Sequence, residues 1–249
     1  MSQQKDKLYA KTRDQVGRFK FDDKVASVFS DMISRSVPSY QPILSMLPTI
    51  TREFRQNGAN YYDLGCSLGA GLHAMSEGLK DTIGLDDISG NLIGIDTSRA
   101  MIERAKDYRC PYSNLSVIFT EANILDSAVN NAAMVLLNFT LQFLPLESRE
   151  NLLGKVYDGL NPGGALILSE KICYEDAATD SKMIDIHHRY KADQGYSQLE
   201  ISQKRDAIEN VLIPETLETH INRLSQVGFS IVTPWHQNLQ FISILAIKG

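Results

Sequence analysis

The chain has 249 residues, a length that one α/β domain with a helical extension explains as easily as two domains. Hydrophobic residues make up 43% and charged residues 22%, as in an ordinary globular protein, which excludes a wholly disordered chain. The net charge of -5 argues against a large nucleic-acid surface, because such surfaces need clustered Lys and Arg to displace phosphate counterions. We therefore expect a folded protein that makes no direct contact with nucleic acid.

Cysteine usage and the N-terminal residues bear on the cellular setting. Cys66, Cys110 and Cys173 are odd in number and widely spaced, unlike a disulfide framework. The N-terminal residues are mainly polar and basic and lack the apolar stretch of a signal peptide or membrane helix. We expect a cytoplasmic protein that does not bind a membrane.

The spacing of apolar residues predicts two N-terminal helices and then alternating strands and helices. Helical spacing begins at Asp22 and ends at residues 36–38, and a second helical pattern precedes the turn at Asn57 and Gly58. Helices are predicted to begin near residues 72, 98, 147 and 217, and a turn at residues 161–164 precedes the fifth strand. Seven strands are predicted, at or around residues 60–64, 92–96, 117, 132–138, 165–169, 231 and 241–247.

This alternation predicts an α/β, Rossmann-like fold, in which a mostly parallel sheet carries helices on both faces. The last two strands have no helix between them, so we expect an antiparallel hairpin at the edge of the sheet. Residues 172–213 break the alternation with polar, helix-prone sequence. We interpret the chain as a single domain, 1–249, with N-terminal helices 1–58, core segments 59–171 and 214–249, and a helical cap inserted at 172–213.

The candidate binding residues follow the strands, because ligands of open α/β sheets lie beyond the carboxyl ends of the strands. The first strand leads into a loop, residues 63–69 (DLGCSLG), whose glycines allow a tight turn and a close ligand approach. The loop lacks the third glycine of a dinucleotide-binding loop and the Lys of a P-loop, so we do not expect it to bind phosphate. Taken alone, it is also consistent with a plain turn between strand and helix.

Polar residues also end three further strands. Asp96 is placed to accept both hydroxyls of a ribose, or alternatively to cap the helix that begins near Ser98. Beyond the third strand, the Asn123 amide can hydrogen-bond an adenine edge while Ile124 packs on the ring. Asn138 ends the fourth strand, either as a binding group or as a capping residue.

Several of these segments together resemble those of a known protein family. The loop Asp63 to Cys66, together with Asp96, Asn138 and the turn at 161–164 (NPGG), resembles class I S-adenosylmethionine-dependent methyltransferases. Residues 136–143 (LLNFTLQF) resemble the carboxy-S-adenosyl-L-methionine synthases more narrowly. Residues 35–40 (RSVPSY) and the cap segment 195–205 (GYSQLEISQKR) share that resemblance, which covers nearly the whole chain.

The resemblance implies an activity and a set of site residues. That family converts S-adenosylmethionine and prephenate into carboxy-S-adenosylmethionine and phenylpyruvate, and the product serves the modification of tRNA wobble uridine. A homodimer is also implied. Arg205 is expected to face the carboxylate that is added. The expected S-adenosylmethionine contacts are Tyr40, Gly65, Cys66, Ser67, Asp96, Thr97, Asn123, Ile124, Asn138 and Arg205.

Two of these positions differ from the family's common residues. Asn123 stands where Asp is common, and Thr97 stands where Asn is common. We expect these differences to weaken the adenosine contacts without abolishing them.

The chemistry of the substrate is consistent with this assignment. A methyl group on a sulfonium is unusually acidic, and the resulting ylide can trap a neighbouring carbon dioxide. The protein must position the reactants, exclude water and offer a cation to the new carboxylate, for which the planar guanidinium of Arg205 is suited. An arbitrary Arg at this place is more often a solvated charge on a helix face, here beside Lys204, and the surrounding motif reverses that expectation for Arg205. No protein general base is assigned, because the hydroxide that leaves prephenate is the proton acceptor proposed for this family.

Two other function classes share these residues. A small-molecule methyltransferase needs the same S-adenosylmethionine contacts but gives no reason for the segment from Tyr196 to Arg205. A non-catalytic module that binds S-adenosylmethionine and regulates a partner is the second alternative.

A metal site is not expected. Asp185, His187 and His188 are close in sequence, but adjacent residues on a helix point about 100° apart and do not easily share one ion. The two histidines can instead shape the substrate pocket. We expect Cys66 to pack rather than react, and Trp235 to lie in the core or at a dimer interface.

Overall fold

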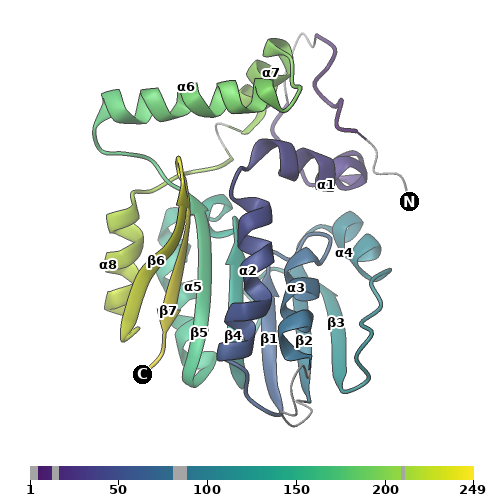
Figure 1. The fold of residues 1–249 in the computed structure, drawn as a ribbon, viewed down its shortest axis with the longest axis vertical. Helices are drawn as coiled ribbons and strands as arrows, with labels where there is room; N and C mark the ends of the chain where they lie inside the picture. The colour runs from purple at the N-terminus through teal and green to yellow at the C-terminus, as the bar shows by residue number, and fades with distance from the viewer. Residues whose placement is uncertain (1–4, 13–16, 81–88, 209–210) are drawn as a thin grey trace.

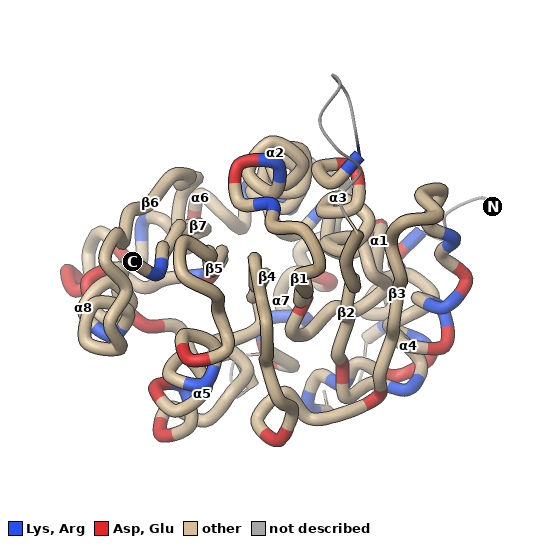
Figure 2. Tube along the Cα trace, turned by 90° about the horizontal axis from the view of Figure 1, so that it is seen from below, with Lys and Arg blue, Asp and Glu red and all other residues tan. Residues whose placement is uncertain are grey.

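A seven-stranded sheet forms the centre of the molecule. The computed structural model describes residues 5–12, 17–80, 89–208 and 211–249. The strand order is β3-β2-β1-β4-β5-β7-β6, and the strands follow one another in this order when seen from below (Figure 2). β1 to β5 are parallel, whereas β7 is antiparallel to both β5 and β6. The strands are β1 (Ala59–Leu64), β2 (Gly90–Asp96), β3 (Leu115–Glu121), β4 (Ala132–Asn138), β5 (Leu160–Lys171), β6 (Ile231–Asn238) and β7 (Phe241–Ile247).

Helices cover both faces of the sheet. Helices α2 (Tyr40–Glu53) and α3 (Ala70–Leu79) lie on one face, and α5 (Leu146–Gly159) and α8 (Leu217–Val227) lie on the other (Figure 2). Alternate residues of a strand point to opposite faces. In β4, accordingly, Met134 and Leu136 pack in the core of the first face, and Val135 and Leu137 in that of the second.

Further helices lie above the carboxyl ends of the parallel strands (Figure 1). These are α1 (Asp23–Ser36) and the helical cap, which consists of α6 (Ala177–Asp193) and α7 (Gln198–Ile208). Asp22 caps α1 by accepting hydrogen bonds from the backbone N–H groups of Lys24 and Val25. The short helices α4 (Arg99–Ala105) and η1 (Leu141–Phe143) follow β2 and β4.

The N-terminal segment, residues 5–12, is attached to the cap. The Tyr196 hydroxyl donates to the carboxylate of Asp6 at 2.7 Å, and the Gln203 amide donates to the carbonyls of Tyr9 and Lys11 at 2.9 and 3.0 Å. Because Asp6 is itself buried, this segment belongs to the packed structure of the cap.

The predicted fold class is confirmed, including the antiparallel hairpin. One boundary was wrong: β5 begins at Leu160, so it includes the four residues predicted as a turn before the strand. The pairing explains this difference, because Ala132 pairs with Leu160 and Met134 pairs with Ala165. The intervening residues bulge out of the ladder, with Gly163 at a φ of 71°. Across the described ranges, no helix is long and apolar enough to span a membrane.

Candidate functional site

A cavity of about 420 Å³ lies at the carboxyl edge of the sheet. Its walls come from the ends of the parallel strands, from α1 and α2, and from the cap. The structure brings together all ten residues predicted to contact S-adenosylmethionine, and each of them lines this cavity: Tyr40, Gly65, Cys66, Ser67, Asp96, Thr97, Asn123, Ile124, Asn138 and Arg205.

The glycine loop approaches its neighbours too closely for larger residues. Gly65 has a φ of 85°, and a Cβ at this position would lie 2.4 Å from Oγ1 of Thr140. A Cβ on Gly71, at the start of α3, would lie 2.4 Å from a carboxylate oxygen of Asp63. Ser67 also has a positive φ, 47°, which costs energy for a residue other than glycine. These close approaches therefore leave the backbone of the loop little room to change its conformation.

Asp96 holds this loop in place. One oxygen of its carboxylate accepts a hydrogen bond from the Ser67 N–H at 2.9 Å, and the other accepts from the Ser98 N–H at 2.8 Å. The helix-capping alternative for Asp96 is wrong, because Ser98 is the N-cap of α4 and its own side chain accepts from the Met101 N–H. Each carboxylate oxygen retains a lone pair for a hydroxyl of the ligand.

Asp63 adds a second carboxyl group, which is buried in the wall near the end of β1. Burial and the nearby Asp96 raise the pKa of Asp63 to about 7. Burial likewise raises the pKa of the Tyr40 hydroxyl and that of the Cys66 thiol, and Asp63 contributes to both shifts. With a raised pKa, Cys66 is a thiol rather than a nucleophilic thiolate, consistent with the packing role expected for it.

Two asparagines lie in the same wall. The Oδ1 atom of Asn138 is buried and has no hydrogen-bond partner among the described residues, so the polar group is available to a ligand. The capping alternative for Asn138 is wrong, because Thr140 occupies the N-cap position of η1. Asn123 uses its Oδ1 to accept from the Leu125 N–H at 3.0 Å, which fixes the side chain beside Ile124.

The side of the cavity formed by the end of β5 and the cap is basic. Lys171 ends β5, Lys191 lies in the last turn of α6, and Lys204 and Arg205 lie on α7. Of these four cations, only Arg205 was predicted from the sequence to line the site. A signal for Lys171 was present, because a charged residue at the carboxyl end of a parallel strand satisfies the same strand-end rule as Asp96.

Aromatic rings form the remaining wall. Phe21 meets Phe19 and Phe143 in edge-to-face pairs, with ring centroids 5.1 and 5.4 Å apart. Phe29 and Phe241 also line the cavity. These rings exclude water and offer apolar contact to a planar ligand. None of them was predicted, since their spacing in the sequence is that of ordinary core residues.

The remaining predicted residues take separate places. His187 lines the cavity, and its Nε2 lies 2.8 Å from the Ser36 carbonyl oxygen. His188 is not among the lining residues. Within the described ranges, no three His, Cys, Asp or Glu side chains gather as metal ligands. Trp235 is partly buried and packs against a small cluster that includes Ile43 and Phe241.

Solved structures share this fold. An O-methyltransferase family protein from Burkholderia thailandensis superposes with a TM-score of 0.58 at 15% identity, covering 92% of this chain and 61% of the other. A putative S-adenosyl-L-methionine-dependent methyltransferase from Methanococcus maripaludis superposes with a TM-score of 0.55 at 16% identity, covering 93% and 95%. Residues 62–164 match a family described as a methyltransferase domain. The fold is thus that of the class I S-adenosylmethionine-dependent methyltransferases.

Sequence relatives narrow the class. A carboxy-S-adenosyl-L-methionine synthase from Hahella chejuensis is 47% identical over 253 residues, covering 100% of both chains. The synthases from Shewanella amazonensis and Colwellia psychrerythraea are 45% and 43% identical, covering 100% and 98% of this chain and of their own. The chain belongs to the family of carboxy-S-adenosyl-L-methionine synthases. S-adenosyl-L-methionine is therefore its substrate, and the predicted family is confirmed.

Proposed function

We propose that this chain transfers the carboxyl group of prephenate to the methyl carbon of S-adenosylmethionine, giving carboxy-S-adenosylmethionine and phenylpyruvate. The observation that carries the proposal is the convergence of the ten predicted positions on one cavity, with Arg205 of the cap among them. The Oδ1 of Asn138, which has no partner among the residues that the structure describes, and two carboxyl groups near the strand ends fit the amino group, ribose and sulfonium of the substrate.

The residues of the cavity would act by placement and charge. Loss of carbon dioxide and hydroxide from prephenate leaves phenylpyruvate, and the hydroxide takes a proton from the sulfonium methyl group. The carbanion so formed attacks the carbon dioxide, and a new C–C bond and a water molecule result. Arg205 would pair with the new carboxylate, and the aromatic wall would keep bulk water from the carbanion.

Further parts of the proposal concern the setting of the reaction. We propose that residues 1–249 act as one S-adenosylmethionine-binding domain with the cap at 172–213, and that the chain works in the cytoplasm as a homodimer. Its product would supply the modification of tRNA wobble uridine without direct contact between this chain and tRNA. The net charge of -5 supports that last point.

Product identity tests the proposal. Purified protein is incubated with S-adenosylmethionine and prephenate, and the products are separated and weighed by mass spectrometry. The expected result is an S-adenosylmethionine derivative heavier by one carboxyl group, with phenylpyruvate in equal amount. S-adenosylhomocysteine in its place would favour a small-molecule methyltransferase, and tight binding of S-adenosylmethionine without turnover would favour a regulatory module.

A further inference from the structure

Charge is unevenly distributed around the cavity. Among the described lining residues, the two acidic ones, Asp63 and Asp96, lie near the carboxyl ends of β1 and β2. The cationic ones lie at the end of β5 and on the cap: Lys171, Lys191, Lys204 and Arg205. One end of the cavity is therefore acidic and the other basic.

Two of the four cations already have partners within the protein. The Arg205 guanidinium pairs with Asp206 at 3.0 Å. The Lys204 ammonium donates to the Ser36 hydroxyl at 2.8 Å and lies 4.0 Å from the buried carboxylate of Asp6. These contacts neutralise part of the charge on α7.

Lys171 and Lys191 differ from this pair. In the part of the chain that the structure describes, neither ammonium group forms an ion pair or a hydrogen bond, although both side chains are half-buried. Burial lowers the pKa of Lys191 to about 7, together with the like charges of the other three cations. Burial also lowers the pKa of Lys171, an effect that Asp180 opposes. Clustered like charges of this kind raise the free energy of the folded protein until an anion binds between them.

The sheet order places these two lysines away from the adenosine end. Asp96 ends β2, and Lys171 ends β5, three strands away in the order β2-β1-β4-β5. At about 4.8 Å between neighbouring strands, this separates the two ends of the cavity by about 14 Å. Asn138, at the end of β4, lies between them. A substrate with its ribose at Asp96 thus reaches towards β4, and the space beyond it faces Lys171.

We propose that Lys171 and Lys191 form the subsite for the carboxylate that the second substrate keeps, so that Arg205 is left for the carboxylate that is transferred. This assignment rests on the proposed function, in which prephenate brings two carboxylates and phenylpyruvate leaves with one. The retained carboxylate must be held apart from the sulfonium for the ring carboxylate to reach the methyl carbon. Lys171 from the sheet and Lys191 from the cap would bind the retained carboxylate from two sides.

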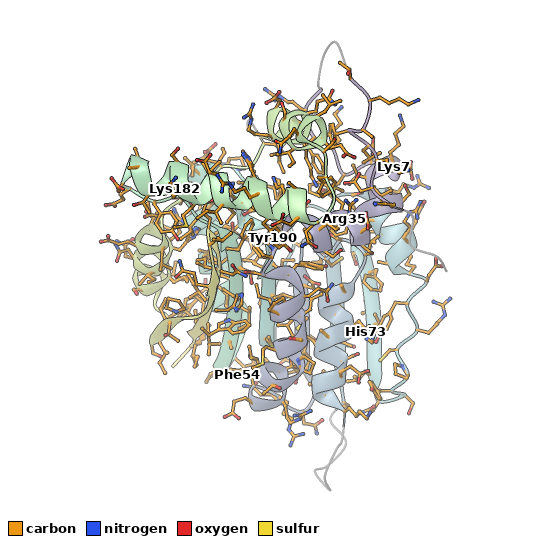
Figure 3. The ribbon with its side chains drawn as sticks, turned by 45° about the horizontal axis from the view of Figure 1, so that its top comes forward. Lys7, Arg35, Phe54, His73, Lys182 and Tyr190 are labelled. Atoms are coloured by element: carbon orange, nitrogen blue, oxygen red, sulfur yellow. The ribbon has the colours of Figure 1, made fainter. Side chains whose placement is uncertain are left out.

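Neutral variants of similar length test the subsite. In Lys171→Met and Lys191→Met, the KM for prephenate should rise about tenfold to a hundredfold, the effect of losing a charged hydrogen bond. The dissociation constant of S-adenosylmethionine, measured by calorimetry, should stay within about twofold. Lys191→Arg should restore most of the prephenate affinity, because the charge returns. Lys182→Met is the matched control, an exposed lysine on the same helix that does not line the cavity (Figure 3).

Two further measurements separate binding from structure. The unliganded Lys191→Met variant should melt at a higher temperature than the wild type, because it removes an uncompensated cation, whereas a structural role predicts a lower one. Calorimetric titration with phenylpyruvate needs no turnover. Phenylpyruvate should bind the wild type and should bind both methionine variants more weakly. If the wild type binds phenylpyruvate but makes no carboxylated product, the proposed activity fails and the subsite stands. An unchanged KM for prephenate, or weakened binding of S-adenosylmethionine alone, would assign the lysines elsewhere and overturn the subsite.

Discussion

The carboxylate of Asp96 is bonded to the backbone N–H of Ser67 at 2.9 Å, so the residue expected to hold the ribose also fixes the loop beside it. Asp96→Asn keeps only one acceptor oxygen and must give up one of its two backbone hydrogen bonds. We expect S-adenosylmethionine to bind about tenfold to a hundredfold more weakly, as for the loss of a charged hydrogen bond. Titration calorimetry measures this, with Glu150→Gln on the exposed face of α5 as the control. Unchanged affinity would show that the loop keeps its shape without Asp96.

Gly65→Ala and Gly58→Ala separate steric conflict from backbone strain. Both glycines have positive φ, 85° and 71°, but only at Gly65 would the new Cβ meet another atom, Oγ1 of Thr140. The variant at Gly58 should lose about 1–2 kcal/mol of unfolding free energy from backbone strain. The variant at Gly65 should lose about 2–5 kcal/mol, because overpacking adds to the strain. Urea denaturation measures both, and equal losses would contradict the close contact with Thr140.

Arg205→Ala should separate turnover from binding. The side chain is 54% exposed and pairs only with its neighbour Asp206 among described residues, so its loss should change the unfolding free energy by no more than about 0.5 kcal/mol. We expect S-adenosylmethionine to bind almost as before, and the rate of carboxylation to fall about a hundredfold or more, as when a group that stabilises developing charge is removed. Rate and binding are measured on the same preparation. If both fall equally, Arg205 does not act on the transferred carboxylate.

The affinity for the second substrate should depend on pH through Lys191. Its pKa is about 7 in the unliganded protein, so the ammonium loses its proton as the pH rises through 7. An anionic substrate requires the charged form, and the KM for prephenate should therefore rise between about pH 7 and 9, up to tenfold per pH unit. Lys191→Arg should flatten this rise, because a guanidinium stays charged. The profile of KM against pH in both proteins is the measurement, and identical profiles would exclude Lys191 as its source.

The unliganded protein should show the opposite trend in stability. In the folded protein, the pKa of Lys191 lies below its ordinary value of 10.5. The contribution of Lys191 to the stability of the fold is therefore full above pH 10.5 and is lost as the pH falls through 7. We expect the wild type to unfold at a lower temperature at pH 6 than at pH 9, by a margin that Lys191→Met reduces. Thermal unfolding of both proteins at the two pH values tests this.

Arg149 should be needed for the fold rather than for the reaction. Its guanidinium is fully buried, pairs with Glu215 at 2.5 Å, and donates to the carbonyls of Leu144 and Ile213 at 3.1 and 2.9 Å. Among the described residues, Arg149→Met leaves Glu215 with Arg223 as its one remaining ion-pair partner, and the change should cost about 3–5 kcal/mol of unfolding free energy. Adding Glu215→Gln should recover part of the loss, as urea denaturation of the single and double variants can show. Additive losses would mean that the two groups act independently.

Much of the fold was predictable because strands with buried faces and short connections follow local rules. The periodicity placed β4 and β7 at their observed bounds. The start of β5 was missed because a bulge is a property of the pairing, and Asn161 to Gly164 look like a free turn when read alone. Asp96 and Asn138 were predictable for the same reason: each directly follows or ends a strand that the local pattern of apolar residues defines.

The rest of the cavity required the folded chain. Helix α6 has only one buried residue, His187, so its sequence gave no sign that Lys191 faces the cavity. The partner of Tyr196 is Asp6, 190 residues away, and no local pattern reveals such a contact. Which charged and polar groups pair within the cap depends on tertiary packing, and local patterns in a single sequence do not reveal that packing.

The bond between Asp6 and Tyr196 has a consequence for how the protein is made. Asp6 is synthesised 190 residues before Tyr196, so it has to wait for this partner until the cap has been made. The sheet can begin to assemble during that interval, whereas the roof of the cavity cannot close. An immature chain would thus have an open, wet pocket, and substrate capture would begin only after synthesis is almost complete.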